Sequence, residues 1–191
     1  MRRLPLAIVG VALASVSWAP GAAAQDESDF VPPDLTVPAQ VVFNATGPTG
    51  ATVIYAVSAT DNADPSPKVE CSPQSGSAFQ IGTTRVTCTA TDASGNSATK
   101  SFDVVVKGAE DQVLELRSDL VEVKQVAARP LSAQLTAVQT AIEANRARAG
   151  CGPLGAFINF VHAQSGKGLT EGQASNLIVG GTRVSAVLDC P

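Results

Sequence analysis

Aromatic and histidine side chains are scarce in this chain of 191 residues. It has one methionine, one tryptophan, one tyrosine and one histidine, beside six phenylalanines. With so few rings, the core has to be built from valine, leucine, isoleucine and alanine. The lone histidine, His162, has no marked aspartate or serine partner, and a G-x-S-x-G nucleophile sequence is absent. We therefore expect no catalytic residue, no bound cofactor and a packed or half-exposed helix position for His162.

Sequences that could bind phosphate or carry acid chemistry are also lacking. The run SGKG at Ser165–Gly168 would need a glycine at Val161 and a serine or threonine at Gly168 to be a phosphate-binding loop. We interpret it as a linker between two helices. The acidic side chains of the second half are spread over different helices and are interpreted as solvated positions: Glu122, Glu143 and Glu171.

A long apolar run is missing, but the first residues have the pattern of a secretory signal. Arg2 and Arg3 precede an apolar stretch shorter than the ~20 residues that a spanning helix needs. Small residues at Ala22–Ala24 complete the pattern, so we predict cleavage after Ala24. The mature chain would begin with a short acidic segment, residues 25–30, and would be soluble, in the periplasm or outside the cell.

Positive charge is in short supply. The whole chain has 13 lysines and arginines against 17 aspartates and glutamates, for a net charge of −4. Loss of Arg2 and Arg3 with the signal would leave 11 against 17, or −6. Nucleic-acid binding requires a basic surface, so we exclude it.

Cysteine occurs only four times, and neither a C-x-x-C pair nor a cysteine–histidine cluster is present. We therefore expect no metal bound by these side chains. An even number of cysteines in an exported chain predicts two disulfides, for which three connectivities are possible. The four residues are Cys71, Cys88, Cys151 and Cys190.

The first half, residues 31–107, has the two-residue alternation of strands. Apolar side chains alternate with threonine, serine and aspartate in ATVIYAVSA, TTRVTCTA and KSFDVVV. Turn residues separate these short runs, which predicts a β-sandwich. A unit of this size has a small core, and a disulfide would stabilise it.

The second half, residues 108–191, changes to helical spacing. We predict helices over 111–127 and 131–149, separated by Pro130 and stopped at Gly150, a third around 154–164, and a fourth after Gly168. Thr170 and Gln173 form a capping box for the fourth helix. The fold class is therefore two domains, an all-β sandwich followed by a small all-α domain.

The β half resembles a known family. The residues that carry the resemblance are Pro32-Pro33, the SATD of Ser58–Asp61, the run CSPQSGSAFQIGTTRVTCTATD and the closing ASGN. Together they resemble the hyalin repeat, or HYR, domain over nearly all of residues 31–107. The resemblance implies an immunoglobulin-like sandwich of extracellular and adhesion-associated proteins.

The HYR resemblance also implies a disulfide. Members of the family often have two further cysteines, at positions where this chain has Val37 and Lys100. Their joint absence here implies that the remaining bridge joins Cys71 to Cys88. Lys100 alternates in step with Phe102 and Val104, so its side chain starts on the inward face of the strand. We expect it at the rim of the sandwich, where its ammonium group can reach water.

The segment between the last two predicted strands contains Asp92, Gly95 and Asn96. Asn, Asp and Gly supply turn geometry, so we predict a hairpin turn. The alternative is a calcium site that combines Asp92 with Asp61 and Asp64 of the other ATD loop and with the neighbouring Asn62 and Asn96. The spacing matches no EF-hand loop, and we favour the turn with no metal bound.

The helical half resembles a FIMAH-type domain of secreted bacterial proteins, through the run AFINFVHAQSGKGLT and the helix after it. The resemblance implies a non-catalytic accessory module. Within it, a bridge between Cys151 and Cys190 would clamp the last two helices together. Since a bacterial source is then implied, we interpret the N-A-T sequon at Asn44–Thr46 as an ordinary polar strand end.

Three functions can be compared on this basis. We favour an exported, non-catalytic binding or adhesion-type module that recognises an extracellular protein or polysaccharide. The alternative is a structural spacer or accessory protein of the cell envelope without its own ligand. An enzyme is rejected, because the two modules use up the mature chain.

Overall fold

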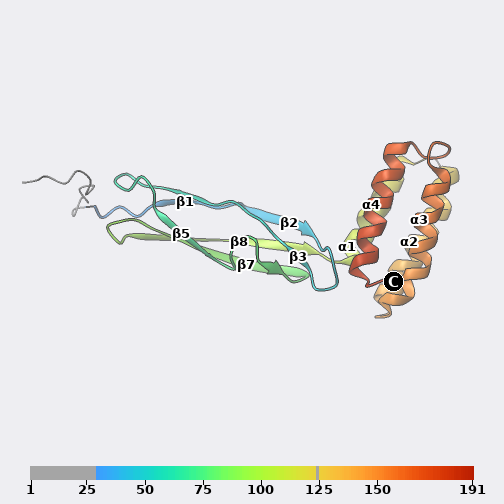
Figure 1. Cartoon of the computed structure of the whole chain (residues 1–191), viewed down its shortest axis with the longest axis horizontal. Coiled ribbons are helices and arrows are strands. Elements are labelled where there is room, and N and C mark those ends of the chain that lie inside the picture. Colours follow the sequence, from blue (N-terminus) through green and yellow to red (C-terminus); the bar gives the residue numbers. More distant parts are fainter. Residues whose placement is uncertain (1–28, 124) are drawn as a thin grey trace, which may run out of the picture.

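The computed structural model describes residues 29–123 and 125–191. The predicted signal peptide, residues 1–24, and its cleavage point lie outside the described residues. An elongated β region is followed by four α-helices, which are grouped at the far end of the strands (Figure 1). The predicted fold class, all-β followed by all-α, is confirmed.

The β region consists of eight strands in three small sheets. A four-stranded sheet has the order β2-β8-β7-β5, and two-stranded sheets pair β1 with β4 and β3 with β6. Only β2 and β8 run parallel to each other. The strands are β1 Asp34–Thr36, β2 Gln40–Asn44, β3 Ala51–Thr52, β4 Ser58–Thr60, β5 Lys68–Ser72, β6 Ala78–Phe79, β7 Gly82–Thr91 and β8 Ser97–Lys107.

The alternation predicted from the sequence sets which side chains face the core. On β7 and β8 the inward set is fully or almost fully buried: Val86, Cys88, Ala90, Phe102, Val104 and Val106. The ring of Tyr55 meets that of Phe102 edge-on, with centroids 5.0 Å apart. Each large apolar side chain so buried contributes about 1.5–3 kcal/mol to folding. Aliphatic burial therefore replaces the aromatic core that this chain lacks.

Lys100 lies at the rim, as its parity predicted. It stands opposite Cys88 in the β7–β8 register, and its side chain is half-exposed. The ammonium group reaches outward to Asp34, 3.2 Å away, near the start of β1. The surrounding strands thus leave the charge in contact with water.

The helices are α1 Ala109–Asp119, α2 Gln125–Glu143, α3 Cys151–Gln164 and α4 Glu171–Val187. Short 3-10 turns follow α1 at Leu120–Glu122 and precede α3 at Ala147–Gly150. Among the described residues, no helix combines the length and the apolar character needed to cross a membrane.

Two predicted helix boundaries are wrong. Pro130 lies inside α2 and does not separate two helices. The first break comes earlier, at the 3-10 turn, where Leu120 and Val123 are both buried and Val123 turns to extended backbone. Helix α2 ends before Gly150, because Asn145 takes the left-handed conformation (φ 57°) and Arg146 donates its N–H back to the Ala141 carbonyl, as in a Schellman motif.

Helix α4 begins as predicted, and its glycine pair has a packing role. The Thr170 hydroxyl accepts the Gln173 N–H while the Gln173 side chain accepts the Thr170 N–H. A Cβ atom at Gly180 would lie 2.6 Å from Leu116 Cδ2, and one at Gly181 would lie 3.0 Å from Ile158 Cγ1. The two glycines therefore let α1 and α3 approach α4 closely.

Each region contains one disulfide. Cys71 of β5 is joined to Cys88 of β7, directly opposite it in the antiparallel register. Cys151, the first residue of α3, is joined to Cys190, just past α4. Neither bridge crosses between the β strands and the helices, so each cross-links its own region.

Removal of one bridge should therefore destabilise one region. We expect Cys151→Ala/Cys190→Ala to lower the free energy of unfolding of the helices by about 4 kcal/mol in the chain-entropy model, because the bridge closes the longer loop. Helical circular dichroism in urea measures this loss. Cys71→Ala/Cys88→Ala is the matched variant and should cost the β region about 3 kcal/mol. Peptide mapping that joins Cys71 to Cys151 or Cys190 would contradict the division.

Candidate functional site

The strands and helices are connected by a buried glutamine at the start of α1. Strand β8 ends at Lys107, and α1 begins two residues later. The side-chain amide of Gln112, which is only 3% exposed, donates to the backbone carbonyls of Ala45 at 3.1 Å and Lys107 at 3.0 Å. The ends of β2 and β8 are thereby held on one side chain of α1.

Glu115, one turn further along α1, adds a charged contact to the same junction. One carboxylate oxygen pairs with the Lys107 ammonium group, and the other accepts the Asn44 amide at 3.3 Å. The hydrogen bond and charge of Glu115 raise the pKa of Lys107 above its usual value. Asn44 is the last residue of β2, as the polar strand-end interpretation predicted, and its amide nitrogen is occupied at this junction.

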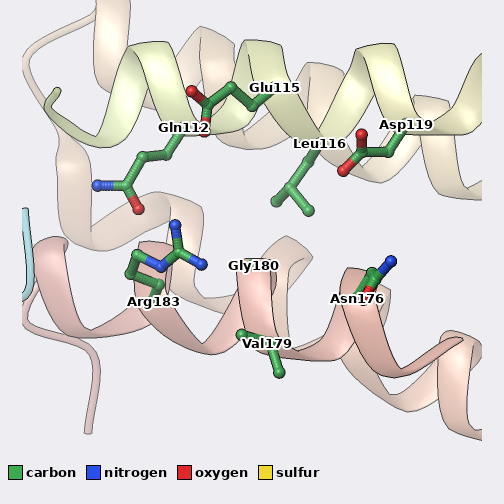
Figure 2. A pocket seen from close by; sticks show the side chains of 8 residues that line it. All are labelled: Gln112, Glu115, Leu116, Asp119, Asn176, Val179, Gly180 and Arg183. Carbon is green, nitrogen blue, oxygen red and sulfur yellow. The ribbon is translucent and has the colours of Figure 1, made fainter. Parts of the chain in front are cut away.

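A groove of about 270 Å³ lies between α1 and α4, beside this junction (Figure 2). Leu116, Val179 and Gly180 contribute apolar surface. The polar lining residues are Gln112, Glu115, Asp119, Asn176 and Arg183. The sequence did not identify these residues as a site, because α1 and α4 are distant in sequence. The only signal was the glycine pair in the middle of α4, which destabilises a helix relative to alanine.

One atom in the groove is incompletely bonded. The Gln112 nitrogen is turned to the two backbone carbonyls, which leaves its Oε1 buried and without a hydrogen-bond partner. Figure 2 shows this oxygen directed toward the Arg183 guanidinium group. None of the five ion pairs among the described residues involves Arg183. The groove therefore offers an acceptor and a charged donor next to each other.

The turn predicted between β7 and β8 is confirmed, at the end of the β region away from the helices. Gly95 has a φ of 93°, which glycine adopts without strain. The Asp92 carboxylate accepts the Asn96 N–H and the Asn96 side-chain amide, both at 2.8 Å. Asp92 thus has a structural role within its own hairpin loop.

The two ATD loops and the start of the β region also meet there. Asp64 accepts the Ala93 N–H at 2.9 Å, which joins the loops, but it is not part of the carboxylate cluster. The cluster consists of Asp29, Asp61 and Asp92, whose carboxylates each place one oxygen within 4.8 Å of the others. Backbone N–H groups of Asp64 and Ala63 lower the pKa of Asp61. Sequence reasoning omitted Asp29 because it precedes both loops.

Residues 28–106 match the HYR domain family. This segment is a HYR domain. HYR domains are immunoglobulin-like modules of extracellular and adhesion proteins. A search of curated proteins finds no match to the chain. The helical region has no family assignment, so its FIMAH-type resemblance stays a prediction.

The HYR domain and the two disulfides together indicate an extracellular, oxidising environment. The one identified family is non-catalytic.

His162 lies on the exposed face of α3, and none of the side-chain hydrogen bonds found within residues 29–123 and 125–191 involves it. The segment Ser165–Gly168 is the α3–α4 connection, as predicted.

The three glutamates interpreted as solvated can be compared with the structure in two cases. Glu143 at the end of α2 and Glu171 at the start of α4 are both exposed. The side chain of Glu122 lies outside what the structure describes.

The junction yields a second prediction. Gln112→Ala should leave the Ala45 carbonyl without the amide donor and cost about 1–3 kcal/mol, whereas the Lys107 carbonyl still accepts the Ala45 N–H at 2.9 Å. We expect the HYR domain and the helices then to unfold in separate transitions. In the chain from Gln25, Tyr55 fluorescence reports only the HYR domain and circular dichroism reports the helices. Leu114→Ala, at a half-exposed position of the same helix, is the control and should leave the transitions as they are. If the HYR domain and the helices of Gln112→Ala still unfold in one common transition, this side chain does not connect them.

Proposed function

We propose that this protein is an exported, non-catalytic binding module that recognises an extracellular hydroxyl-rich ligand, a glycan, in the α1–α4 groove. The HYR domain supports an extracellular interaction role, and the signal sequence with cleavage after Ala24 accounts for export. The observation that carries the proposal is the unpartnered Gln112 Oε1 beside the Arg183 guanidinium group.

The chemistry of these two groups selects the ligand. An amide oxygen only accepts hydrogen bonds, and a guanidinium group only donates them. A hydroxyl group does both, so a sugar hydroxyl that accepts from Arg183 can also donate to Gln112 once the atoms that cover the buried Oε1 shift aside. A buried acceptor without a partner costs free energy, and a ligand that satisfies it recovers that energy on binding.

The rest of the lining fits the same ligand. Asp119 and Asn176 extend the polar rim, and Leu116 and Val179 supply apolar surface for the C–H face of a sugar ring. A small number of placed polar groups over apolar surface is the usual composition of a ligand site. The groove lies in the helical region, so the HYR domain would act as its rigid support through the Gln112 junction.

The test is binding of labelled protein to cells of the producing organism and to a polysaccharide panel. We expect saturable binding that Arg183→Ala weakens roughly 10–100-fold, because a hydrogen bond from a charged group is lost. Arg85→Ala is the control, since Arg85 is exposed on β7, is paired with Asp103 and does not line the groove. Equal loss in both variants would show nonspecific charge attraction. Full binding by Arg183→Ala would place the ligand elsewhere.

The spacer without a ligand remains the second candidate, and the junction is the observation that favours it. A side chain that holds two strand ends against a helix gives a fixed connection suited to a structural link. Absence of binding by the unmodified chain to every polysaccharide and cell surface tested would favour this reading. Hydrolysis of a polysaccharide or peptide that His162→Ala abolishes would instead overturn both non-catalytic functions.

A further inference from the structure

The carboxylates at the end of the HYR domain away from the helices come from three separate places in the chain. Asp29 precedes β1, Asp61 directly follows β4 and Asp92 directly follows β7. The β1–β4 register pairs Asp34 with Thr60, so the start of β1 and the end of β4 coincide. The strand arrangement thus gathers residues that the sequence separates by about thirty positions each.

Burial makes this cluster unlike an ordinary acidic surface. Asp29 is 8% exposed and Asp92 is 7% exposed, and Asp61 is partly buried. The oxygens that face one another lie within 4.8 Å. Like charges at this separation repel strongly when they are removed from water. None of the five ion pairs in the described part of the chain brings a lysine or arginine to them.

N–H donors already position one oxygen of Asp29 and one of Asp61, whereas both oxygens of Asp92 accept from Asn96. Asp29 Oδ1 accepts from the Val31 backbone at 3.1 Å and from the Asn62 amide at 3.2 Å. Asp61 Oδ1 accepts from the backbone of Ala63 and Asp64, at 3.0 and 2.9 Å. These bonds fix the direction of both carboxylates.

The second oxygens of these two groups have no partner at all. Asp29 Oδ2 and Asp61 Oδ2 are buried, and they are two of the four buried side-chain atoms without a hydrogen bond among the described residues. Native proteins rarely leave such atoms unsatisfied, and a bound ion is one of the accepted reasons.

We propose that Asp29, Asp61 and Asp92 bind a calcium ion, through the unpartnered Oδ2 atoms of Asp29 and Asp61 and one oxygen of Asp92. Calcium takes oxygen ligands in flexible geometry, whereas magnesium demands a near-ideal octahedron and keeps its waters. The ion offsets most of the cluster's charge. It also ties the leading segment at Asp29 to the ends of β4 and β7.

The consequence is a calcium-dependent end of the HYR domain, remote from the helical groove. The extracellular environment that the disulfides indicate is where sites with dissociation constants of about 10⁻⁴–10⁻³ M are loaded. Phe30 and Val31, next to Asp29, are exposed. Bound calcium would therefore fix the direction of these two apolar residues relative to the domain.

The experiment measures calcium binding by the full chain with calcium chloride alone, by calorimetry and by thermal unfolding at constant ionic strength. We expect saturable binding and a rise of roughly 5 °C in the unfolding midpoint at tenfold excess over the dissociation constant. Magnesium at the same concentration should give a clearly smaller rise. An equal rise in magnesium, or none in calcium, would overturn the proposal.

Asp29→Asn separates the calcium site from a merely structural role. Asparagine retains an oxygen to accept the Val31 N–H, and it removes one negative charge. In chelator the variant should unfold at a higher temperature than the unmodified chain, because repulsion is relieved, and its calcium affinity should fall at least tenfold. Asp34→Asn, at an exposed position nearby, is the matched control and should keep the full calcium response. A full response in Asp29→Asn, or its loss in Asp34→Asn, would refute the site.

Discussion

The arrangement of this molecule depends on the amide of Gln112. Two neighbouring strands, β2 and β8, run parallel and end side by side, which leaves the carbonyls of Ala45 and Lys107 at the edge of the sheet. Buried carbonyls require donors: the side-chain amide supplies one N–H to the Ala45 carbonyl and a second to the Lys107 carbonyl, which also accepts the Ala45 N–H. This constraint fixes how α1 leaves the sheet. The position of α1 in turn sets Leu116 against Gly180 and so forms the groove.

The same amide links stability to a binding function. Because its nitrogen is turned to the sheet, its oxygen must point toward α4, where no protein group bonds it. Asp29 and Asp61 at the other end of the HYR domain repeat this arrangement, with one carboxylate oxygen held by N–H donors and the other without a partner. At both places the bonds that hold the fold orient an unsatisfied oxygen, and these are the places where a ligand would gain most.

Small, aliphatic cores explain why each region has a covalent cross-link. The HYR domain buries mainly valines and alanines with Leu35 and three aromatic rings, Tyr55, Phe79 and Phe102, and the helices bury mainly leucine and valine. In domains of this size, the free energy gained by burying apolar surface exceeds the conformational entropy lost on folding by only a small margin. The Cys71–Cys88 and Cys151–Cys190 bridges restrict the unfolded chain in each region separately.

The sequence by itself determined the fold class, the inward faces of β7 and β8, the hairpin at Asp92–Asn96 and the capping box of α4. These features follow from local periodicity and turn chemistry, which neighbouring residues specify. Only the structure showed the interior position of Pro130, the end of α2 at Asn145, the groove and the approach of Asp29 to Asp61. The groove and the approach of Asp29 to Asp61 depend on contacts between segments far apart in the chain, whereas the end of α2 is a local cap at Asn145 that the apolar spacing does not reveal. Periodicity shows which face of an element is buried, but only packing determines what that face meets.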